Sequence, residues 1–165
     1  MKIKLLEDIG VNYPINSDEN DFVQEVEKIR GTEGLDMIFD SIGGNTVKRG
    51  FRLLSPAGRI ICYGGSRRSN RTNIFYDIKF ALGFGIYSPI GLMLKSRSII
   101  GVNMLRIADE RPEIIKKAMV SIISMVNSGE IPVPVGRSFP VSELAEAHNL
   151  LETRESIGKI AVEWE

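Results

Sequence analysis

The chain has 165 residues, which is enough for one domain with a core of its own. Apolar residues make up 43% of it and charged residues 25%, as in an ordinary globular protein. The 21 basic residues equal the 21 acidic ones, so the net charge gives no reason to expect nucleic acid or an acidic membrane surface as a partner.

The chain contains one cysteine, Cys62, and one histidine, His148. A single cysteine excludes an internal disulfide and fits a reducing compartment, so we expect a cytoplasmic protein. Two such residues cannot form a four-ligand structural zinc site, and we expect no metal. Residues 1–8 lack the apolar run of a signal peptide, and nothing approaches the roughly 18 to 20 apolar residues of a membrane span.

The first third of the chain predicts two helices and one extended piece. Residues 2–9 have apolar side chains on one face and end at Gly10, which suits the position after a helix. Residues 13–15 form a short extended piece. Residues 18–30 have helical spacing with acidic residues in the first turn.

Two apolar runs joined by a helix-length segment follow. Residues 35–40 and 58–63 predict buried parallel strands, 45–54 a helix and 55–58 a turn. Each strand ends in a polar and glycine-rich turn. Because ligands bind outside the carboxyl ends of parallel strands, this βαβ pattern predicts a nucleotide-binding oxidoreductase.

The second half predicts short elements around one long helix. Residues 74–94 favour two short helices around a Gly-Pro break, 98–102 a strand and 112–127 a helix. Residues 131–139 contain two prolines and favour an edge strand or an extended segment. The last elements are a helix over 143–152 with Ser142 as its N-cap, and a closing strand over 159–163.

Several residues of the two turns have structural as well as functional interpretations. Asp40 either orients a ribose or caps the following helix. Gly43 and Gly44 serve first the tight turn itself and then close approach of a ligand. The Gly64–Ser66 stretch favours contact with a phosphate or ribose. Tyr63 either stacks on a ligand ring or packs in the core with a hydrated hydroxyl.

The ordered spacing of these motifs resembles the C-terminal half of medium-chain dehydrogenases/reductases of the zinc-free quinone oxidoreductase type. The stretch 5–16 is similar to the family's L-x-x-L-G-A-D-x-V-I-N, and 21–40 to D-F-x-x-x-V…G-V-D-V-V-x-D. Residues 54–59 resemble L-x-x-x-G-R, and 158–160 resemble the final G-K-V strand. The 67–97 segment is most similar to the subgroup around the vesicle amine transport protein.

The resemblance implies a site for NADP(H) at the carboxyl ends of the strands and names no catalytic residue. The implied cofactor-binding residues are Lys2, Ser41, Ile42, Gly43, Tyr63, Gly64, Gly65, Ser66, Val102, Asn103 and Arg154. In the family, a lysine at the position of Lys2 holds the adenosine 2′-phosphate, and an arginine at that of Arg154 reaches the NADP side of the site. A family tyrosine near that phosphate is replaced by Ser17, so the preference for NADP over NAD is only partly supported.

The implied fold is α/β: a partial Rossmann domain with a doubly wound, mostly parallel sheet over residues 1–130. A strand-helix-strand tail over 131–165 belongs to the catalytic domain in full-length relatives. In the family, the first βαβ unit with its glycine turn precedes the residue that aligns with the start of this chain. Residues 13–16, taken as a strand, and 35–40 then flank a gap of two strands, so we expect the chain to belong to a larger assembly, pair with another chain or rearrange.

The implied activity is NADPH-dependent transfer of hydride to a quinone or an α,β-unsaturated carbonyl. We find no acid, base or nucleophile constellation, and we expect a homodimer through the edge strand at 98–103. The alternative is a truncated or degenerate Rossmann module that acts as an interaction or regulatory piece without catalysis, because it lacks the pyrophosphate turn. A nucleotide-sensing domain completed by strands from another chain is a third hypothesis.

Overall fold

The computed structural model describes residues 2–65, 74–153 and 155–164. The chain divides into two compact units. The sheet unit is Ile15–Pro112, and the terminal unit combines Met1–Pro14 with Glu113–Glu165. No helix in the described ranges combines the length and apolar content needed to cross a lipid bilayer.

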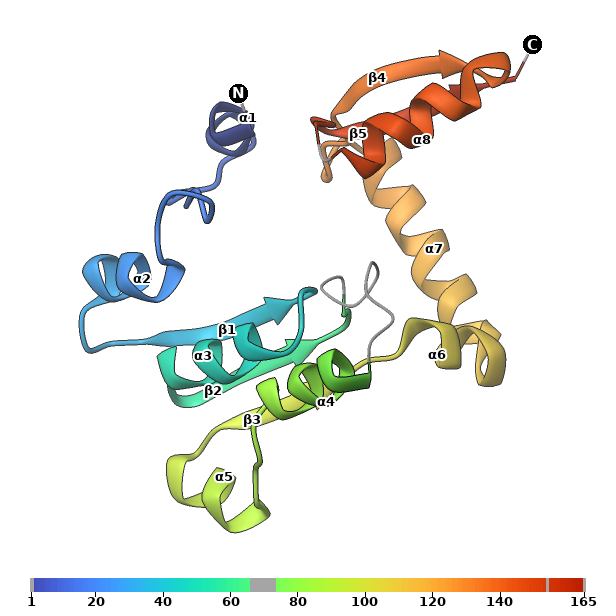
Figure 1. Ribbon diagram of the computed structural model, residues 1–165. Helices are drawn as coiled ribbons and strands as arrows, with labels where there is room; N and C mark the ends of the chain where they lie inside the picture. Colours follow the sequence, from blue (N-terminus) through green and yellow to red (C-terminus); the bar gives the residue numbers. More distant parts are fainter. Residues whose placement is uncertain (1, 66–73, 154, 165) are drawn as a thin grey trace. The chain divides into compact units, whose positions relative to one another are not determined.

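The sheet unit is built on three parallel strands in the order β1-β2-β3. The strands are β1 (Leu35–Asp40), β2 (Leu54–Cys62) and β3 (Ser98–Gly101), and the helices between them are α3 (Asn45–Leu53), α4 (Ile74–Gly83) and α5 (Pro89–Lys95). Helix α3 packs on β1 and β2 and also contacts α4 (Figure 1). This is the parallel α/β arrangement that the sequence predicts, and the two short helices around the Gly-Pro break are confirmed.

The core of the sheet unit lies between α3 and one face of the sheet. Its buried side chains are Val47, Phe51, Leu54 and Ile60. On the opposite face, Met37 and Phe39 alternate with the inward-facing residues of β1 and are 46% and 65% exposed. Sheets of this kind are normally covered on both faces, so one face of this sheet lacks its cover within the unit.

Helix α2 (Phe22–Arg30) begins four residues later than the expected start at residue 18. The physical reason is Asp21, whose Oδ1 accepts hydrogen bonds from two amides of the first turn at 3.0 and 3.3 Å and thereby fixes the helix start. The other oxygen of Asp21 accepts a hydrogen bond from Arg49, which ties α2 to α3. The guanidinium of Arg49 also lies over the Phe22 ring.

Two further expectations are wrong. Residues 13–16 form no strand, because no described strand pairs with them. The predicted turn at 55–58 lies inside β2, which begins at Leu54. The register of the pairing between β1 and β2 shifts at this point, from the pair Leu35–Leu54 to the pair Met37–Arg59, as at a β-bulge.

One short helix was not predicted from the sequence. Helix α6 (Met104–Glu110) begins after Asn103, whose side-chain oxygen accepts a hydrogen bond from the amide of Arg106 at 3.1 Å. Such a cap can start a helix too short to show a clear apolar period.

The terminal unit contains a parallel two-stranded sheet and its connecting helix. Its elements are α1 (Lys2–Asp8), α7 (Pro112–Asn127), β4 (Val135–Pro140), the 3₁₀ turn η2 (Val141–Glu143), α8 (Leu144–Glu152) and β5 (Lys159–Glu163). Strand β4 pairs with β5, and α8 packs on both with Phe139 and Ala147 buried between them. This confirms the strand-helix-strand tail. The expected cap is wrong, because the 3₁₀ turn holds Ser142 and leads directly into α8.

Candidate functional site

The first turn of the candidate site follows β1 and is organised by a buried carboxylate. Asp40 is 7% exposed, and its Oδ1 accepts hydrogen bonds from the amides of Ile42 at 2.9 Å and Gly43 at 2.6 Å. These bonds fold the chain back on itself before α3. Asp40 therefore holds the turn and does not cap the following helix, since the N-cap of α3 is Gly44 and no side chain caps it. The ribose contact stays a prediction.

The second turn follows β2 and touches the first turn backbone to backbone. The amide of Tyr63 donates to the carbonyl oxygen of Asp40 at 3.0 Å. A Cβ placed on Gly64 would lie 2.5 Å from the carbonyl oxygen of Ser41, closer than real Cβ atoms come. Glycine at position 64 is therefore required by the close approach of the two turns.

The third turn follows β3 and lies beside the second. The amide of Val102 donates to the carbonyl oxygen of Cys62 at 2.8 Å, and Asn103 comes next. The side-chain oxygen of Asn103 caps α6, so it is already engaged in a hydrogen bond. The three turns therefore lie at one edge of the sheet, at the carboxyl ends of all three strands.

Most of the predicted cofactor-binding residues come together at this edge. They are Ser41, Ile42, Gly43, Tyr63, Gly64, Gly65, Val102 and Asn103. Lys2 lies in α1 of the terminal unit, so its place in the site stays a prediction. Ser66 and Arg154 lie outside the described residues.

Two aromatic residues that the sequence analysis did not single out support the glycine turns. Phe80 of α4 and Phe84, the residue after that helix, meet edge to face with their ring centroids 5.2 Å apart. A Cβ on Gly43 would lie 2.9 Å from Phe80 and 3.0 Å from Phe84, and a Cβ on Gly44 would lie 3.0 Å from Phe80. Both glycines also have positive φ, at 79° and 66°. The glycines thus let α4 pack directly under the first turn.

Two large side chains at this edge remain available to a ligand. Ile42 is 44% exposed and Tyr63 is 45% exposed, on neighbouring turns. Tyr63 is therefore not a core residue, which removes one of its two interpretations. An apolar side chain and a phenol on a backbone of fixed turns are suited to contact with a planar ring.

Cys62 at the end of β2 is a poor nucleophile. Burial, and secondarily the negative charge of Asp40, raises the pKa of the Cys62 thiol above its ordinary value. The thiol packs against the core of the sheet unit and stays protonated at neutral pH. We identify no catalytic group in these turns.

The described residues do not fit a metal ion. No group of three or more histidine, cysteine, aspartate or glutamate side chains in the described ranges could hold one. Cys62 belongs to the sheet unit and His148 to the terminal unit. We therefore derive no step of the chemistry from zinc.

The sequence model of one protein family, described as zinc-binding dehydrogenase, matches residues 9–162. A zebrafish (Danio rerio) protein, the synaptic vesicle membrane protein VAT-1 homolog, is 29% identical in an alignment of 159 positions that covers 94% of this chain and 32% of that protein. A 2-haloacrylate reductase from a Burkholderia species is 27% identical over 154 residues, 93% of this chain and 42% of the enzyme.

The solved structures show the same fold. The CurF ER cyclopropanase of the curacin A biosynthetic pathway superposes with a TM-score of 0.74 at 24% identity, over 99% of this chain and 44% of that chain. The chain thus spans less than half the length of each relative named here.

Proposed function

The chain belongs to the zinc-binding dehydrogenase family, and from that premise we propose that it forms part of an NADPH-dependent oxidoreductase. Family membership implies a nicotinamide cofactor, and the proposed reaction is transfer of hydride to a quinone or an α,β-unsaturated carbonyl. The proposal places the nicotinamide end of the cofactor on the turns after β1, β2 and β3.

One observation carries this proposal: three turns from three parallel strands converge at one edge of the sheet, held by bonds between their backbones. Asp40 fixes the first turn, Tyr63 joins the second to it, and Val102 joins the third to β2. A site built in this way is rigid before a ligand arrives, so little binding energy is lost in ordering it.

The nicotinamide, when bound, supplies the hydride. The residues of the chain bind and orient it. Ile42 and Tyr63 present an apolar surface and a phenol to the ring, and Gly64 lets the turn that carries Tyr63 pack against Ser41 of the first turn. In this proposal, the chain contributes position and exclusion of water, and no proton transfer is assigned to it.

The substrate class follows from two sources. A 2-haloacrylate reductase is among the related enzymes, and its named substrate is an α,β-unsaturated acid. The quinone comes from the family resemblance alone. Preference for NADP rests on Lys2, in α1, as the partner of the 2′-phosphate.

Three further points belong to the proposal. No zinc takes part in the reaction, and the protein is cytoplasmic. Residues 1–130 belong to the cofactor-binding domain and residues 131–165 to the catalytic domain.

The proposal includes a homodimer formed through β3. This strand is the last in the order β1-β2-β3, so one of its edges has no partner within the described sheet. Pairing with the same strand of a second copy would satisfy its free backbone groups.

Isothermal titration of the 165-residue chain with NADPH, with NADH as the comparison, tests the proposal. Saturable binding with NADPH the tighter ligand is the expected result. Assays with quinones and with α,β-unsaturated carbonyls would then follow. Absence of binding at millimolar NADPH would contradict a cofactor site formed by these turns.

The alternative is a module that binds a partner protein and performs no catalysis. The observation in its favour is the uncovered sheet face, where Met37 and Phe39 are exposed on β1. This alternative would be supported if the chain bound neither NADPH nor NADH in the titration but bound a protein through this face.

A further inference from the structure

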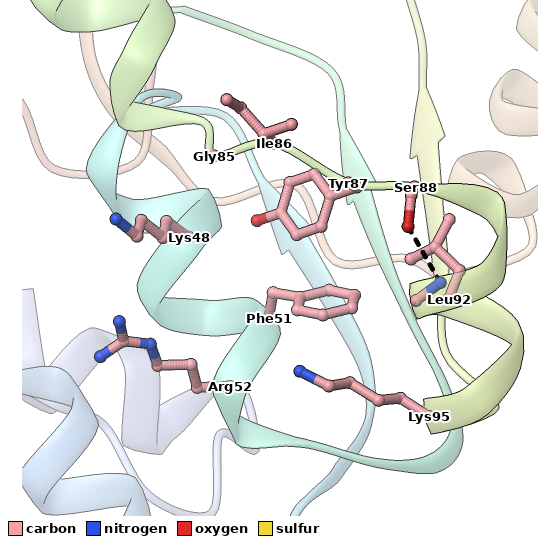
Figure 2. Close-up of a pocket in the computed structure, with 10 residues that line it drawn as sticks. Lys48, Phe51, Arg52, Gly85, Ile86, Tyr87, Ser88, Leu92 and Lys95 are labelled. Carbon is pink, nitrogen blue, oxygen red and sulfur yellow. Dashed lines mark hydrogen bonds between the residues drawn. The ribbon is translucent and has the colours of Figure 1, made fainter.

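A pocket of about 260 Å³ lies in the sheet unit between α3, the segment 85–88 and α5 (Figure 2). Its lining includes two aromatic residues, Phe51 and Tyr87, and three basic residues, Lys48, Arg52 and Lys95. An apolar cavity of about 150 Å³ already accommodates benzene, so this pocket has room for an aromatic ring and a further group.

The pocket is not the proposed cofactor site. Arg52 stands two residues before Leu54, where β2 begins, and Lys95 stands three before Ser98, where β3 begins. These two cations therefore lie toward the amino ends of the strands, whereas the cofactor turns follow the carboxyl ends. A ligand of the pocket would be a second ligand of the chain.

All the charged side chains that line the pocket are positive. Its lining contains three cations and no acidic residue. None of the three cations forms an ion pair with a residue that the structure describes. Clustered like charges without counterions repel one another, and an anion bound among them would relieve that repulsion.

The floor of the pocket offers a hydrogen-bond donor as well as an aromatic surface. The rings of Phe51 and Tyr87 meet edge to face with centroids 4.8 Å apart. The hydroxyl of Tyr87 is out of contact with solvent and has no hydrogen-bond partner among the described residues. Figure 2 shows this hydroxyl pointing toward Lys48 on α3.

The state of this hydroxyl fits a donor. Burial raises the pKa of Tyr87 above its ordinary value, with the nearby Cys62 adding to the effect and Arg52 opposing it. The hydroxyl therefore stays protonated at neutral pH. A buried polar group without a partner costs stability, and a bound acceptor would recover that cost.

We propose that this pocket binds a small phosphate monoester with an aromatic or similarly apolar body. The phosphate lies among Lys48, Arg52 and Lys95 and accepts a hydrogen bond from Tyr87. The apolar body lies against the ring of Phe51. The inference goes beyond the proposed function and stands or falls independently of it.

Phenyl phosphate is the probe, titrated calorimetrically into the 165-residue chain, with inorganic phosphate and phenol as partial probes. We expect phenyl phosphate to saturate one site and to bind more tightly than either partial probe. Failure of phenyl phosphate to saturate at millimolar concentration would overturn the proposal. Equal affinity for phenyl phosphate and inorganic phosphate would also overturn it, because the aromatic floor would then contribute nothing.

Three variants locate the binding. Arg52→Ser should lower the affinity for phenyl phosphate about tenfold or more, because it removes a charge-assisted contact. Lys116→Ser removes an exposed cation of α7, outside the pocket, and should leave the affinity unchanged. Tyr87→Phe should weaken binding while leaving the thermal stability of the ligand-free chain unchanged or higher. Equal loss in R52S and K116S, or full affinity in Y87F, would contradict the assignment.

Discussion

Substituting Gly64 with alanine tests the contact between the first two turns most sharply. The added Cβ would lie 2.5 Å from the carbonyl oxygen of Ser41, whereas real Cβ atoms stay beyond 3.0 Å. The obstacle is backbone, which cannot rotate away as a flexible side chain can, so one turn must move by roughly half an ångström or more. Overpacking of this kind costs about 1–3 kcal/mol.

The expected consequence is measurable by thermal unfolding. For a chain of this size, a loss of about 2 kcal/mol lowers Tm by roughly 4–8 °C, which circular dichroism resolves easily. In the proposed function, the same variant should bind NADPH more weakly, because the two turns proposed to contact the cofactor are forced apart.

Gly101→Ala is the matched control. Gly101 ends the neighbouring strand β3, and a Cβ placed on it meets nothing within 4 Å. Its replacement should be neutral or stabilising by about 0.4–1 kcal/mol, since alanine restricts the unfolded chain. A G64A chain as stable as G101A would refute the close approach of the turns.

Three further predictions concern other parts of the chain. Asp21→Asn keeps a helix cap but removes the ion pair with Arg49. The hydrogen bond from Arg49, followed by those from the α2 amides, lowers the pKa of Asp21 below its ordinary 3.8, so the stabilisation is present above that pH and lost below it. The melting temperature of the unmodified chain should exceed that of D21N at neutral pH, and a gap that persists in strong acid would contradict this. Iodoacetamide should alkylate Cys62 more slowly in the folded chain than in urea at the same mildly alkaline pH, because burial raises the thiol pKa; a faster folded reaction would refute it. Light scattering well above micromolar concentration should give a dimer, and a monomer there would exclude pairing through β3.

The strands and their terminal turns were predictable because local sequence determines them. An apolar run that ends in glycine and polar residues predicts a strand and the turn after it, as for β1 and β2, although the pattern did not reveal that one face of β1 is exposed. The bulge at Ala57 was not predictable, because Ser-Pro-Ala-Gly is ordinary turn chemistry. Only the partner strand makes it an irregularity inside a ladder.

In the candidate site, too, the sequence predicted the turns but not the tertiary contacts that explain them. Glycines at 43, 44 and 64 could be identified from the sequence, but the reason for each is a tertiary neighbour. Gly64 faces the backbone of Ser41, and Gly43 faces Phe80 of α4, more than thirty residues further along the chain. The spacing of residues along the sequence does not reveal such a neighbour, so the contacts of Phe80 and Phe84 with the glycine turns were not predicted.

The most direct test of the central claim is to map NADPH on the labelled chain by amide chemical shifts. The shifts should gather on the turns after the three strands, at 41–43, 63–65 and 102–103. Saturable NADPH binding whose shifts avoid these turns, and fall instead on the pocket beside α3 and α5, would contradict it.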